Sequence, residues 1–392
     1  MAIILCCWGS IMENGIKNGF TELGEPVSCF NREIDNYDTD TGYLHALSDY
    51  LRSRSDASAV VSVNFIPIIA MACKAHKIMY ISWTVDCPCL TLYSNTLAYP
   101  TNLVFLFDRA QYSRFADVNP GHIFHLPLGF DPTVAKQMRP TFAERKKYDC
   151  DVSFVGSLYT KGNQYDEVAD KLSGYMRGYA EGLIAAQANV YGYNLIADSI
   201  TDKWADNFMA GAHFQVLDNY SKDYKNFIAD YYIGYKCTQL ERIKIMRALS
   251  NPIDGVKLNT HLYTTSDTKK YPEINNRGIA DSNKVMPKVF ASSRINLNIS
   301  LKSITSGIPL RCFDIMGMGG FLLSNYQPEL AELFTNGEEV VMYESIHDLI
   351  DKVRYYLAHE DERRAIAAAG QKKVLEEYSF KKQIERMLGM IG

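Results

Sequence analysis

A polar loop that follows an apolar strand is the strongest candidate for chemistry in this sequence. The apolar run Ile295–Ile299 leads into the small residues Ser303–Gly307, and Pro309 stands where the first turn of a helix favours proline. The first N–H groups of a helix have no intrahelical partner and attract anions. Ser306 and Gly307 would therefore present hydroxyl and backbone donors to a phosphate group.

Two charged residues follow in the expected helix. Asp314 would lie about a turn and a half into it, where its carboxylate can accept two hydrogen bonds from a ribose diol. Arg311 lies close to one turn earlier, so it could reach a phosphate or pair with Asp314. From the residues alone, an ordinary strand and helix with an Arg311–Asp314 ion pair explains the segment as well as a nucleotide site does.

Length and composition bound the class of protein. The 392 residues, of which 47% are hydrophobic and 22% charged, are enough for two globular domains. A net charge of −4 gives no broad positive field for a nucleic-acid partner. No apolar run reaches the ~20 residues that cross a bilayer, so we expect no transmembrane segment, while peripheral membrane contact stays open. Nine cysteines, mostly inside apolar runs, favour a cytoplasmic location.

The first domain is expected at residues 1–130. Short β-branched runs alternate there with helical patterns, which predicts a doubly wound parallel sheet. The expected helices include Met12–Leu23, Gly42–Arg54 and Pro67–Ala75. The expected strands are Ile3–Cys7, Pro26–Phe30, Ala59–Val63, Ile78–Trp83, Leu103–Phe107 and His122–Leu126.

The second domain is expected at residues 131–375, with a helix at about 376–392 packing back onto the first. Its opening stretch, Asp131–Tyr148, is polar and basic and is typical of a linker. A strand at Asp151–Val155 follows, and residues 164–250 read as a helical insertion. The strand and helix alternation then resumes at Val256–Tyr263, Val285–Ser292, Ile295–Ile299, Pro309–Met316, Gly320–Ser324 and Ile346–Ala358, before an amphipathic tail, Asp361–Met390.

Several stretches resemble the CgeB-type, spore-maturation-protein-like glycosyltransferase family. They are Asp151-Val-Ser-Phe-Val-Gly-Ser157, Ile295-Asn-Leu-Asn298, Gly307-Ile-Pro-Leu-Arg-Cys-Phe-Asp314, Gly319-Gly-Phe-Leu-Leu-Ser324 and Tyr326-Gln-Pro-Glu-Leu330. The resemblance implies the α/β GT-B fold, in which two Rossmann-like domains face each other across a cleft. It also implies an enzyme, a hexosyltransferase-like glycosyltransferase that uses a nucleoside-diphosphate sugar, with a UDP-sugar as the expected donor.

The resemblance also implies roles for residues of the second domain. In such retaining transferases two acidic residues eight positions apart flank the donor; here the second is Asp314, whereas the first position holds Ser306. Gly156 and Ser157 would lie near the diphosphate, and Lys161 would supply positive charge, unless it simply points into solvent. Two further sheet edges would hold the base through Thr264, Ile279 and Met286.

The first domain is expected to bind the acceptor. Asp86 follows a strongly apolar strand, so its carboxylate would lie at the carboxyl edge and could deprotonate an acceptor hydroxyl. A turn or N-cap aspartate is the alternative. Trp8-Gly9-Ser10 ends the first strand, and Gly9 would let an acceptor approach the backbone.

The predicted function is transfer of a sugar from a nucleotide donor to a hydroxyl of a glycan, protein or small molecule, as in the synthesis of bacterial surface glycans. Arg311, Lys161 and helix N–H groups would stabilise the departing diphosphate in place of a metal, so we expect neither a metal nor a cofactor. The resemblance to retaining transferases implies retention of configuration. No His or acidic cluster has metal-ligand spacing. The alternative is a catalytically degenerate module that binds nucleotide or glycan as a scaffold, which Ser306 in place of an acid favours.

Overall fold

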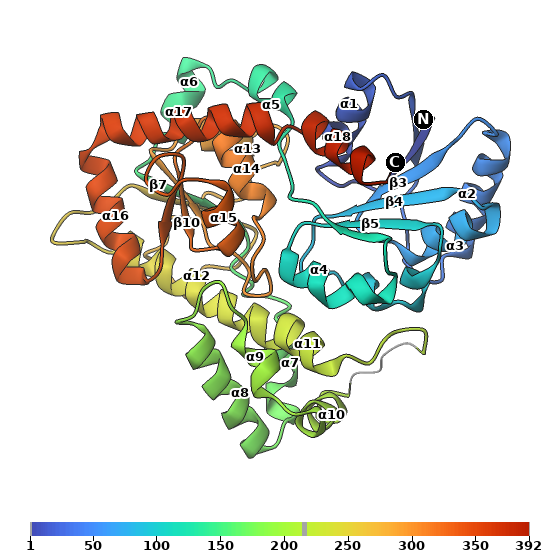
Figure 1. The fold of residues 1–392 in the computed structure, drawn as a ribbon. Coiled ribbons are helices and arrows are strands. Elements are labelled where there is room, and N and C mark those ends of the chain that lie inside the picture. The colour runs from blue at the N-terminus through green and yellow to red at the C-terminus, as the bar shows by residue number, and fades with distance from the viewer. Residues whose placement is uncertain (1, 214–217, 392) are drawn as a thin grey trace. The chain divides into compact units, whose positions relative to one another are not determined.

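The chain forms two compact units, each built on a parallel sheet (Figure 1). The computed structural model describes residues 2–213 and 218–391. Unit 1 comprises Met1–Asp131, Val216–Lys222 and Glu377–Gly392, and unit 2 comprises Pro132–Gln215 and Asp223–Glu376. Across these described residues, no helix is both long and apolar enough to span a membrane.

The sheet of unit 1 has six parallel strands in the order β2-β1-β3-β4-β5-β6. The order reverses between β1 and β3, which makes their carboxyl ends the switch point of the sheet. The strands are β1 (Ile3–Cys7), β2 (Val27–Asn31), β3 (Ala59–Val63), β4 (Met79–Thr84), β5 (Asn102–Leu106) and β6 (Ile123–His125). The main helices are α1 (Glu13–Glu22), α2 (Thr41–Ser53), α3 (Pro67–His76), α4 (Arg109–Phe115) and α18 (Phe380–Ile391).

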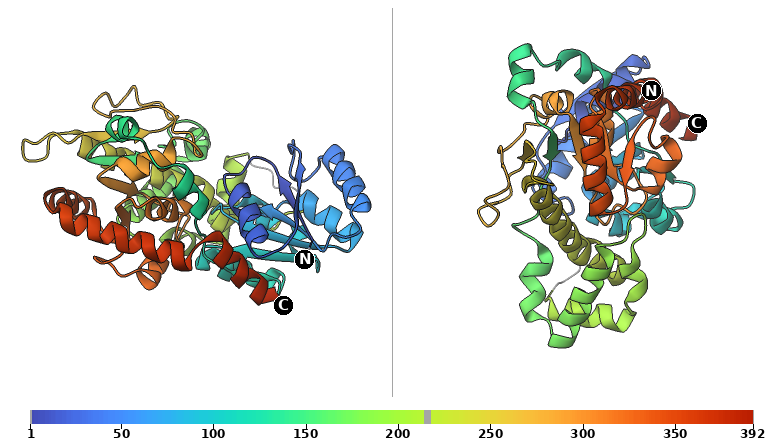
Figure 2. Two further views of the ribbon diagram at one scale, coloured as in Figure 1. Left: turned by 90° about the horizontal axis from the view of Figure 1, so that it is seen from above. Right: turned by 90° about the vertical axis from the view of Figure 1, so that its left-hand side faces the viewer.

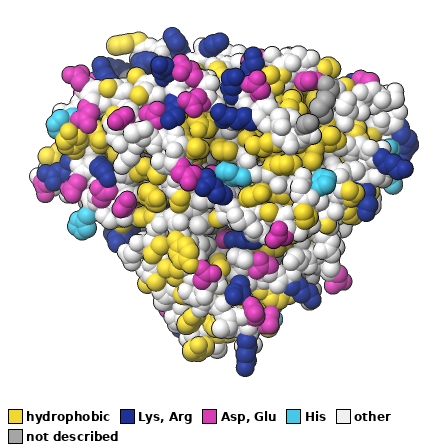
Figure 3. All heavy atoms as spheres, viewed as in Figure 1, with side chains coloured by type: hydrophobic (Ala, Val, Ile, Leu, Met, Phe, Trp, Pro, Cys, Tyr) yellow, Lys and Arg dark blue, Asp and Glu magenta, His cyan; other side chains and the backbone are white. Residues whose placement is uncertain are grey.

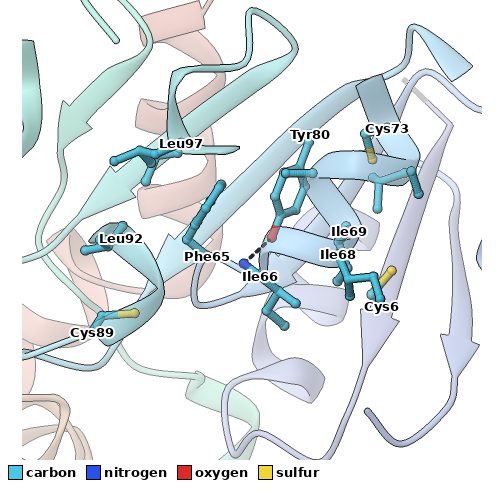
Figure 4. Close-up of a cluster of buried hydrophobic side chains, with 14 of the residues drawn as sticks. Cys6, Phe65, Ile66, Ile68, Ile69, Cys73, Tyr80, Cys89, Leu92 and Leu97 are labelled. Carbon is cyan, nitrogen blue, oxygen red and sulfur yellow. Dashed lines mark hydrogen bonds between the residues drawn. The ribbon is translucent and has the colours of Figure 1, made fainter. Parts of the chain in front are cut away.

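One face of this sheet packs against α2 and α3 in a core of aliphatic and aromatic side chains (Figure 4). Tyr80 is fully buried there, and its hydroxyl accepts from the backbone N–H of Ile66 at 2.9 Å and bonds to Ser62 Oγ at 2.7 Å. Because a buried phenol without partners would cost free energy, these bonds let Tyr80 fill the core. They also fix the start of α3 against β4.

The C-terminal helix α18 packs against α1 in unit 1, and two glycines of α1 make the close approach possible. A Cβ at Gly15 would lie 2.0 Å from the ring of Phe380, and one at Gly19 would lie 2.6 Å from Ile384 Cδ1. The Phe380 ring also meets Trp83 edge to face at 5.6 Å. The tail therefore belongs to the core of unit 1 although it is the last segment of the chain.

The sheet of unit 2 has five parallel strands in the order β11-β10-β9-β7-β8. The strands are β7 (Val152–Val155), β8 (Thr260–Tyr263), β9 (Ile295–Asn298), β10 (Leu322–Asn325) and β11 (Val341–Tyr343). Around them lie α5 (Pro132–Gln137), α6 (Phe142–Tyr148), α13 (Met286–Ser292), α14 (Leu310–Gly317), α15 (Pro328–Leu333), α16 (Ile346–Ala358) and α17 (Glu360–Glu377).

A helical insertion separates β7 from β8. Figure 1 and the right-hand view of Figure 2 show it, in green and yellow, projecting from one side of unit 2. It contains α7 (Gln164–Val168), α8 (Gly174–Gln187), α9 (Leu195–Ser199), α10 (Asp202–Gly211), α11 (Tyr224–Phe227), the π-helix η5 (Ile228–Gly234) and α12 (Tyr235–Ser250).

The predicted α/β fold with two parallel sheets and an insertion is confirmed, with local corrections. The stretch Asp131–Tyr148 is not an irregular linker, because it forms α5 and α6, the latter opened by a Thr141 capping box. The strand expected from Val256 begins only at Thr260. The tail that was expected to be helical forms two helices, α17 and α18.

Substituting Gly15 tests the packing of α18 on α1. In Gly15→Ala the new methyl group would overlap the ring of Phe380. Alanine also favours the helix by about 1 kcal/mol over glycine, but we expect the clash to outweigh this gain and to lower the melting temperature. Gly182→Ala in α8 is the matched control, since a Cβ there meets nothing within 4 Å and should leave the melting temperature unchanged or higher. A Gly15→Ala protein as stable as the Gly182→Ala protein would contradict this packing.

Candidate functional site

The switch point of the unit 2 sheet lies between β7 and β9. From β7 the chain proceeds to β8 on one side and then to β9 on the other, so the loops after β7 and β9 diverge. Ligands of open parallel sheets bind in the crevice that such a divergence leaves at the carboxyl edge. Gly156–Lys161 follow β7, and Ile299–Gly307 follow β9 and lead into α14.

Arg311, in the first turn of α14, lies directly against Gly156 at this point. A Cβ on Gly156 would lie 3.0 Å from a terminal guanidinium nitrogen of Arg311, so a glycine leaves the room that the arginine occupies. The guanidinium donates to Asn298 Oδ1 at 2.9 Å and lies 5.3 Å from the centre of the Phe154 ring. Burial, and then repulsion by Arg242, lowers the pKa of Arg311 to about 10, which still leaves it protonated at neutral pH.

Arg242, from α12, brings a second guanidinium to the same place. It donates to the carbonyl of Ser157 at 2.7 Å and, through two nitrogens, to the carbonyl of Ile299. It therefore ties the loop after β7 to the loop after β9. Its guanidinium lies 5.2 Å from the Phe154 ring, so both arginines contact one aromatic ring.

The positive charge of this pair is not neutralised by the protein. Within the described residues, neither Arg242 nor Arg311 makes an ion pair with a carboxylate, and the charge of Arg242 is one cause of the lowered pKa of Arg311. The alternative of an Arg311–Asp314 ion pair is thus not what the structure shows, although Asp314 attracts Arg311 from beyond ion-pair distance. Because a buried charge without a charged partner costs free energy, an added anion would be attracted to this pair.

Asp314 lies on α14 beside this cationic pair. Its side chain forms no hydrogen bond within the described residues, so both oxygens can accept from a ligand. Burial raises the pKa of Asp314 to about 7, and the nearby charge of Arg311 offsets only part of that effect. A titratable group perturbed in this way at a sheet switch point is typical of a functional site.

The loop that carries Ser306 is clamped by the residues after β10. The Asn325 side chain accepts from the backbone N–H of Ser300 at 2.7 Å, and Gln327 donates to the carbonyl of Ile304 at 3.2 Å. Ser306 Oγ donates to the fully buried carboxylate of Glu329 at 2.8 Å. Asn325 and Gln327, from the segment after β10, thus hold the loop in place. The carboxylate that contacts Ser306 belongs to Glu329, which lies in α15.

The other predicted donor residues lie at the ends of β7 and β8. Ser157 accepts from the N–H of Tyr159 at 2.9 Å, and Thr264 accepts from that of Ser266 at 3.1 Å, so both hydroxyls shape their own loops. Lys161 is exposed to solvent, which is the alternative that the sequence left open for it. Two candidates for the base site lie further on: Ile279 is 72% exposed, and Met286 begins α13.

In unit 1, Asp86 lies just beyond the carboxyl end of β4. Asn64 donates to its carboxylate at 2.7 Å and accepts from the backbone N–H groups of Val85 and Asp86, so Asp86 does not cap a helix. Asn64 adopts a left-handed conformation, with φ of 59°, to make these bonds. Surrounding protein desolvates the carboxylate and raises the pKa of Asp86, while one edge stays exposed to solvent.

The switch point of unit 1 is closed to an anion by the protein's own carboxylate. Glu13 Oε1 accepts from the backbone N–H groups of Trp8, Gly9 and Ser10, at 2.8, 2.9 and 2.9 Å. Three converging N–H groups after a first strand are the arrangement that binds phosphate in many α/β sheets. Here they are satisfied internally, in contrast with the open cationic pair of unit 2.

Sequence reasoning missed Arg242, Asn298 and Glu329. Arg242 lies in α12, and the sequence did not show where this helix of the insertion would lie relative to the sheet. The burial of the Arg242 side chain follows only from the three-dimensional structure. Asn298 lay inside the predicted strand Ile295–Ile299 and ends β9 in the structure, and a polar residue inside an apolar run was the available signal. Among the described residues, no three His, Cys, Asp or Glu side chains gather as metal ligands would.

Comparisons with known proteins agree with this geometry. Residues 242–389 match a family model described as glycosyl transferase-like. Sucrose-phosphate synthase from Thermosynechococcus elongatus superposes with a TM-score of 0.55 at 8% identity, covering 100% of this chain and 99% of that one. The chain has the GT-B fold. The family match covers less than half of the chain, so it shows a likeness of residues 242–389 to glycosyl transferases.

Two further GT-B structures show the same likeness over the whole chain. HepE from Anabaena in complex with UDP has a TM-score of 0.53 at 9% identity, covering 100% of this chain and 99% of that one. A glycosyltransferase from Rickettsia africae has a TM-score of 0.52 at 10% identity, covering 99% and 97%. At such identities the likeness establishes the fold alone. A comparison with curated proteins found no match.

The raised pKa of Asp314 predicts a pH-dependent stability. Between about pH 4, the ordinary range of an unfolded aspartate, and about pH 7, the folded protein holds a proton that the unfolded chain releases, so stability falls as pH rises through this window. Asp314→Asn removes the titration and should raise the melting temperature at pH 8 but not at pH 4. Asp206→Asn, an exposed residue of α10, is the control; equal shifts for both variants at pH 8 would contradict the burial of Asp314.

Proposed function

We propose that the chain transfers a sugar from a nucleoside-diphosphate donor, a UDP-sugar, to a hydroxyl acceptor. The observation that carries this proposal is the pair of guanidiniums, Arg242 and Arg311, without a carboxylate partner at the switch point of unit 2. A diphosphate is the anion that a nucleotide sugar brings. Among relatives of the same fold, structures of HepE contain UDP and UDP-glucose, which supports this class of donor.

In the proposed donor complex, the diphosphate binds near Gly156 and Arg311. Gly156 lacks a side chain there, and Ser157, Ser306 and Gly307 border the same edge. Arg311 is the group best placed to stabilise negative charge on the departing diphosphate, because its charge is unpaired and partly desolvated. Lys161 is the second cation, from an exposed position on the loop after β7.

The nucleoside is assigned to residues that flank this point. Asp314 has two free carboxylate oxygens and suits the two hydroxyls of a ribose. Thr264 and Met286 lie at the ends of neighbouring elements, and the exposed Ile279 offers apolar surface to a base. The donor assignment therefore rests most heavily on Asp314 and Arg311, and the base contacts follow from the family resemblance.

Unit 1 is proposed to bind the acceptor, with Asp86 as the base. Its raised pKa brings the carboxylate closer to the pH at which a base works well, and Asn64 orients it. The occupied N–H cradle at Glu13 supports the same division, since it leaves no comparable phosphate site at the switch point of unit 1. The acceptor is a glycan, a protein or a small molecule.

Four finer assignments complete the proposal. The transfer retains anomeric configuration, it proceeds without a metal ion, the chain is of the CgeB type, and it works in the cytoplasm on surface glycans. The CgeB-type assignment and retention rest on the resemblance of Gly307–Asp314. A cytoplasmic location fits nine cysteines that are all free thiols.

A catalytically degenerate module that binds nucleotide or glycan is the second candidate. The observation that favours it is Ser306, which stands where related retaining transferases carry an acid. Its hydroxyl donates to Glu329, so it is already engaged by the protein. UDP binding without turnover for any donor and acceptor pair would favour this reading.

Replacing Arg311 tests the donor site. Arg311→Gln removes the cation and keeps a polar side chain, so UDP affinity measured by calorimetry should fall about tenfold to a hundredfold, as expected for loss of a charged hydrogen bond. Arg354→Gln, on the exposed face of α16, is the control and should leave affinity unchanged. Equal UDP affinity in Arg311→Gln and the unsubstituted protein would rule out the assigned phosphate site.

Replacing Asp86 tests the acceptor role. Asp86→Asn should lower turnover by about two to four orders of magnitude and leave UDP affinity unchanged, because it removes a base in unit 1 and touches no donor residue. Asp117→Asn, an exposed residue of unit 1, is the control. Parallel loss of turnover and of UDP binding would remove Asp86 from the acceptor site.

A further inference from the structure

The segment Lys136–Lys147 forms a basic surface that the proposed reaction does not use. It spans the end of α5, the connecting loop and α6, and we call it the α5–α6 surface. In Figure 3 Lys and Arg side chains gather along the upper edge of the view, over α5 and α6. The exposed cations of this surface are Lys136, Arg139, Arg145, Lys146 and Lys147.

Phe142 projects from the middle of these cations. Its side chain is 87% exposed, more than any other large hydrophobic side chain in the described part of the chain. Phe142 is the first residue of α6, so Arg145 and Lys146, three and four residues on, share its helix face. The Phe142 ring and Lys146 therefore lie on one exposed face, while the Arg145 guanidinium reaches the carbonyl of Ala291 in α13.

The acidic residues of the segment leave the surface positive. Glu144 is engaged on the other side of α6: its carboxylate caps Thr141 and pairs with Lys288 of α13 at 2.5 Å. These contacts, with the hydrogen bond from Lys288 first, lower the pKa of Glu144 to about 2. Asp149, two residues beyond the segment, is an exposed acid, against five exposed cations within the segment.

The capping box holds Phe142 in its exposed position. Thr141 Oγ1 accepts from the N–H of Glu144 at 3.3 Å, and Glu144 accepts from the N–H of Thr141 at 2.9 Å. Lys288 anchors this box to α13, and Arg145 donates to the carbonyl of Ala291 at 3.2 Å. The ring thus stands on a fixed first turn and is not free to fold back onto the sheet.

We propose that the α5–α6 surface binds an anionic lipid bilayer. The cations contact lipid phosphates, and Phe142 enters the boundary between headgroups and acyl chains. This goes beyond the proposed function, because no donor or acceptor residue belongs to the surface. It would bring the enzyme to a membrane without a spanning helix.

Charge and shape favour a bilayer over a nucleic acid or an acidic protein. The cations lie on two short helices around a projecting ring, whereas phosphate-backbone sites combine cations with a groove or with aromatic rings on which bases stack. The chain as a whole carries a net charge of −4, so attraction to a polyanion would be confined to this one surface. An apolar ring among cations gains most where headgroups and hydrocarbon adjoin.

Co-sedimentation of the full chain with vesicles tests the proposal. We expect binding to vesicles of phosphatidylcholine with phosphatidylglycerol, little binding to phosphatidylcholine alone, and release as salt is raised. The double variant Lys146→Glu with Lys147→Glu should bind at least about tenfold more weakly, since it reverses two charges. Phe142→Ser should weaken binding several-fold and leave the salt dependence in place.

Matched controls in unit 2 keep the test specific. Lys269→Glu with Lys270→Glu reverses another adjacent lysine pair, and Val256→Ser removes another exposed apolar side chain; both should bind as the unsubstituted protein does. Equal binding to both vesicle types, or equal loss in the Lys269 and Lys270 variant, would overturn the proposal. Tighter binding to a duplex DNA oligonucleotide that Phe142→Ser leaves unchanged would assign the surface to a polyanion instead.

Discussion

Two guanidiniums on one aromatic ring, with no carboxylate paired to either among the residues that the structure describes, set the constraint on which the rest of unit 2 depends. Arg242 and Arg311 both contact Phe154, and their mutual repulsion is one cause of the lowered pKa of Arg311. Several features hold the pair in place: Gly156 leaves room for one guanidinium, and the carbonyls of Ser157 and Ile299 accept from the other. Holding two like charges together lowers the stability of the folded protein, and binding of an anionic ligand would offset this loss.

The two units share a sheet architecture but differ in the polar groups at the point where the strand order reverses. Each has a parallel sheet whose strand order reverses once, and this switch point is where ligands of such sheets bind. In unit 1 the backbone N–H groups of that region donate to the Glu13 carboxylate, whereas in unit 2 the cations Arg242 and Arg311 form no ion pair within the described residues. This difference is the reason why we propose the donor site in unit 2.

The sequence was sufficient for the fold because the strands are short apolar runs between helical patterns. β1 and β3 begin and end where they were expected, and so does α16. The linker was misjudged because the charges of α6 lie on an exposed helix that Thr141 caps. The position of Arg311 relative to Gly156 was beyond sequence reasoning, since it depends on the crossover between β7 and β9 and on an arginine from the insertion.

The candidate site shows the same limit. The chemistry of Asp314 followed from its place in a helix, but its burial and the absence of an ion pair with Arg311 follow from packing. Ser306 read as the loss of an acid, whereas the structure brings the Glu329 carboxylate to its hydroxyl from the segment after β10. Such a contact joins residues 23 positions apart, and no local pattern announces it.

A crystal structure of the chain with UDP tests the central claim most directly. The account predicts the diphosphate between the ends of β7 and β9, within hydrogen-bond distance of Arg311, with the ribose hydroxyls on Asp314. A diphosphate bound elsewhere, for example on the Trp8–Ser10 loop after displacement of Glu13, would contradict it.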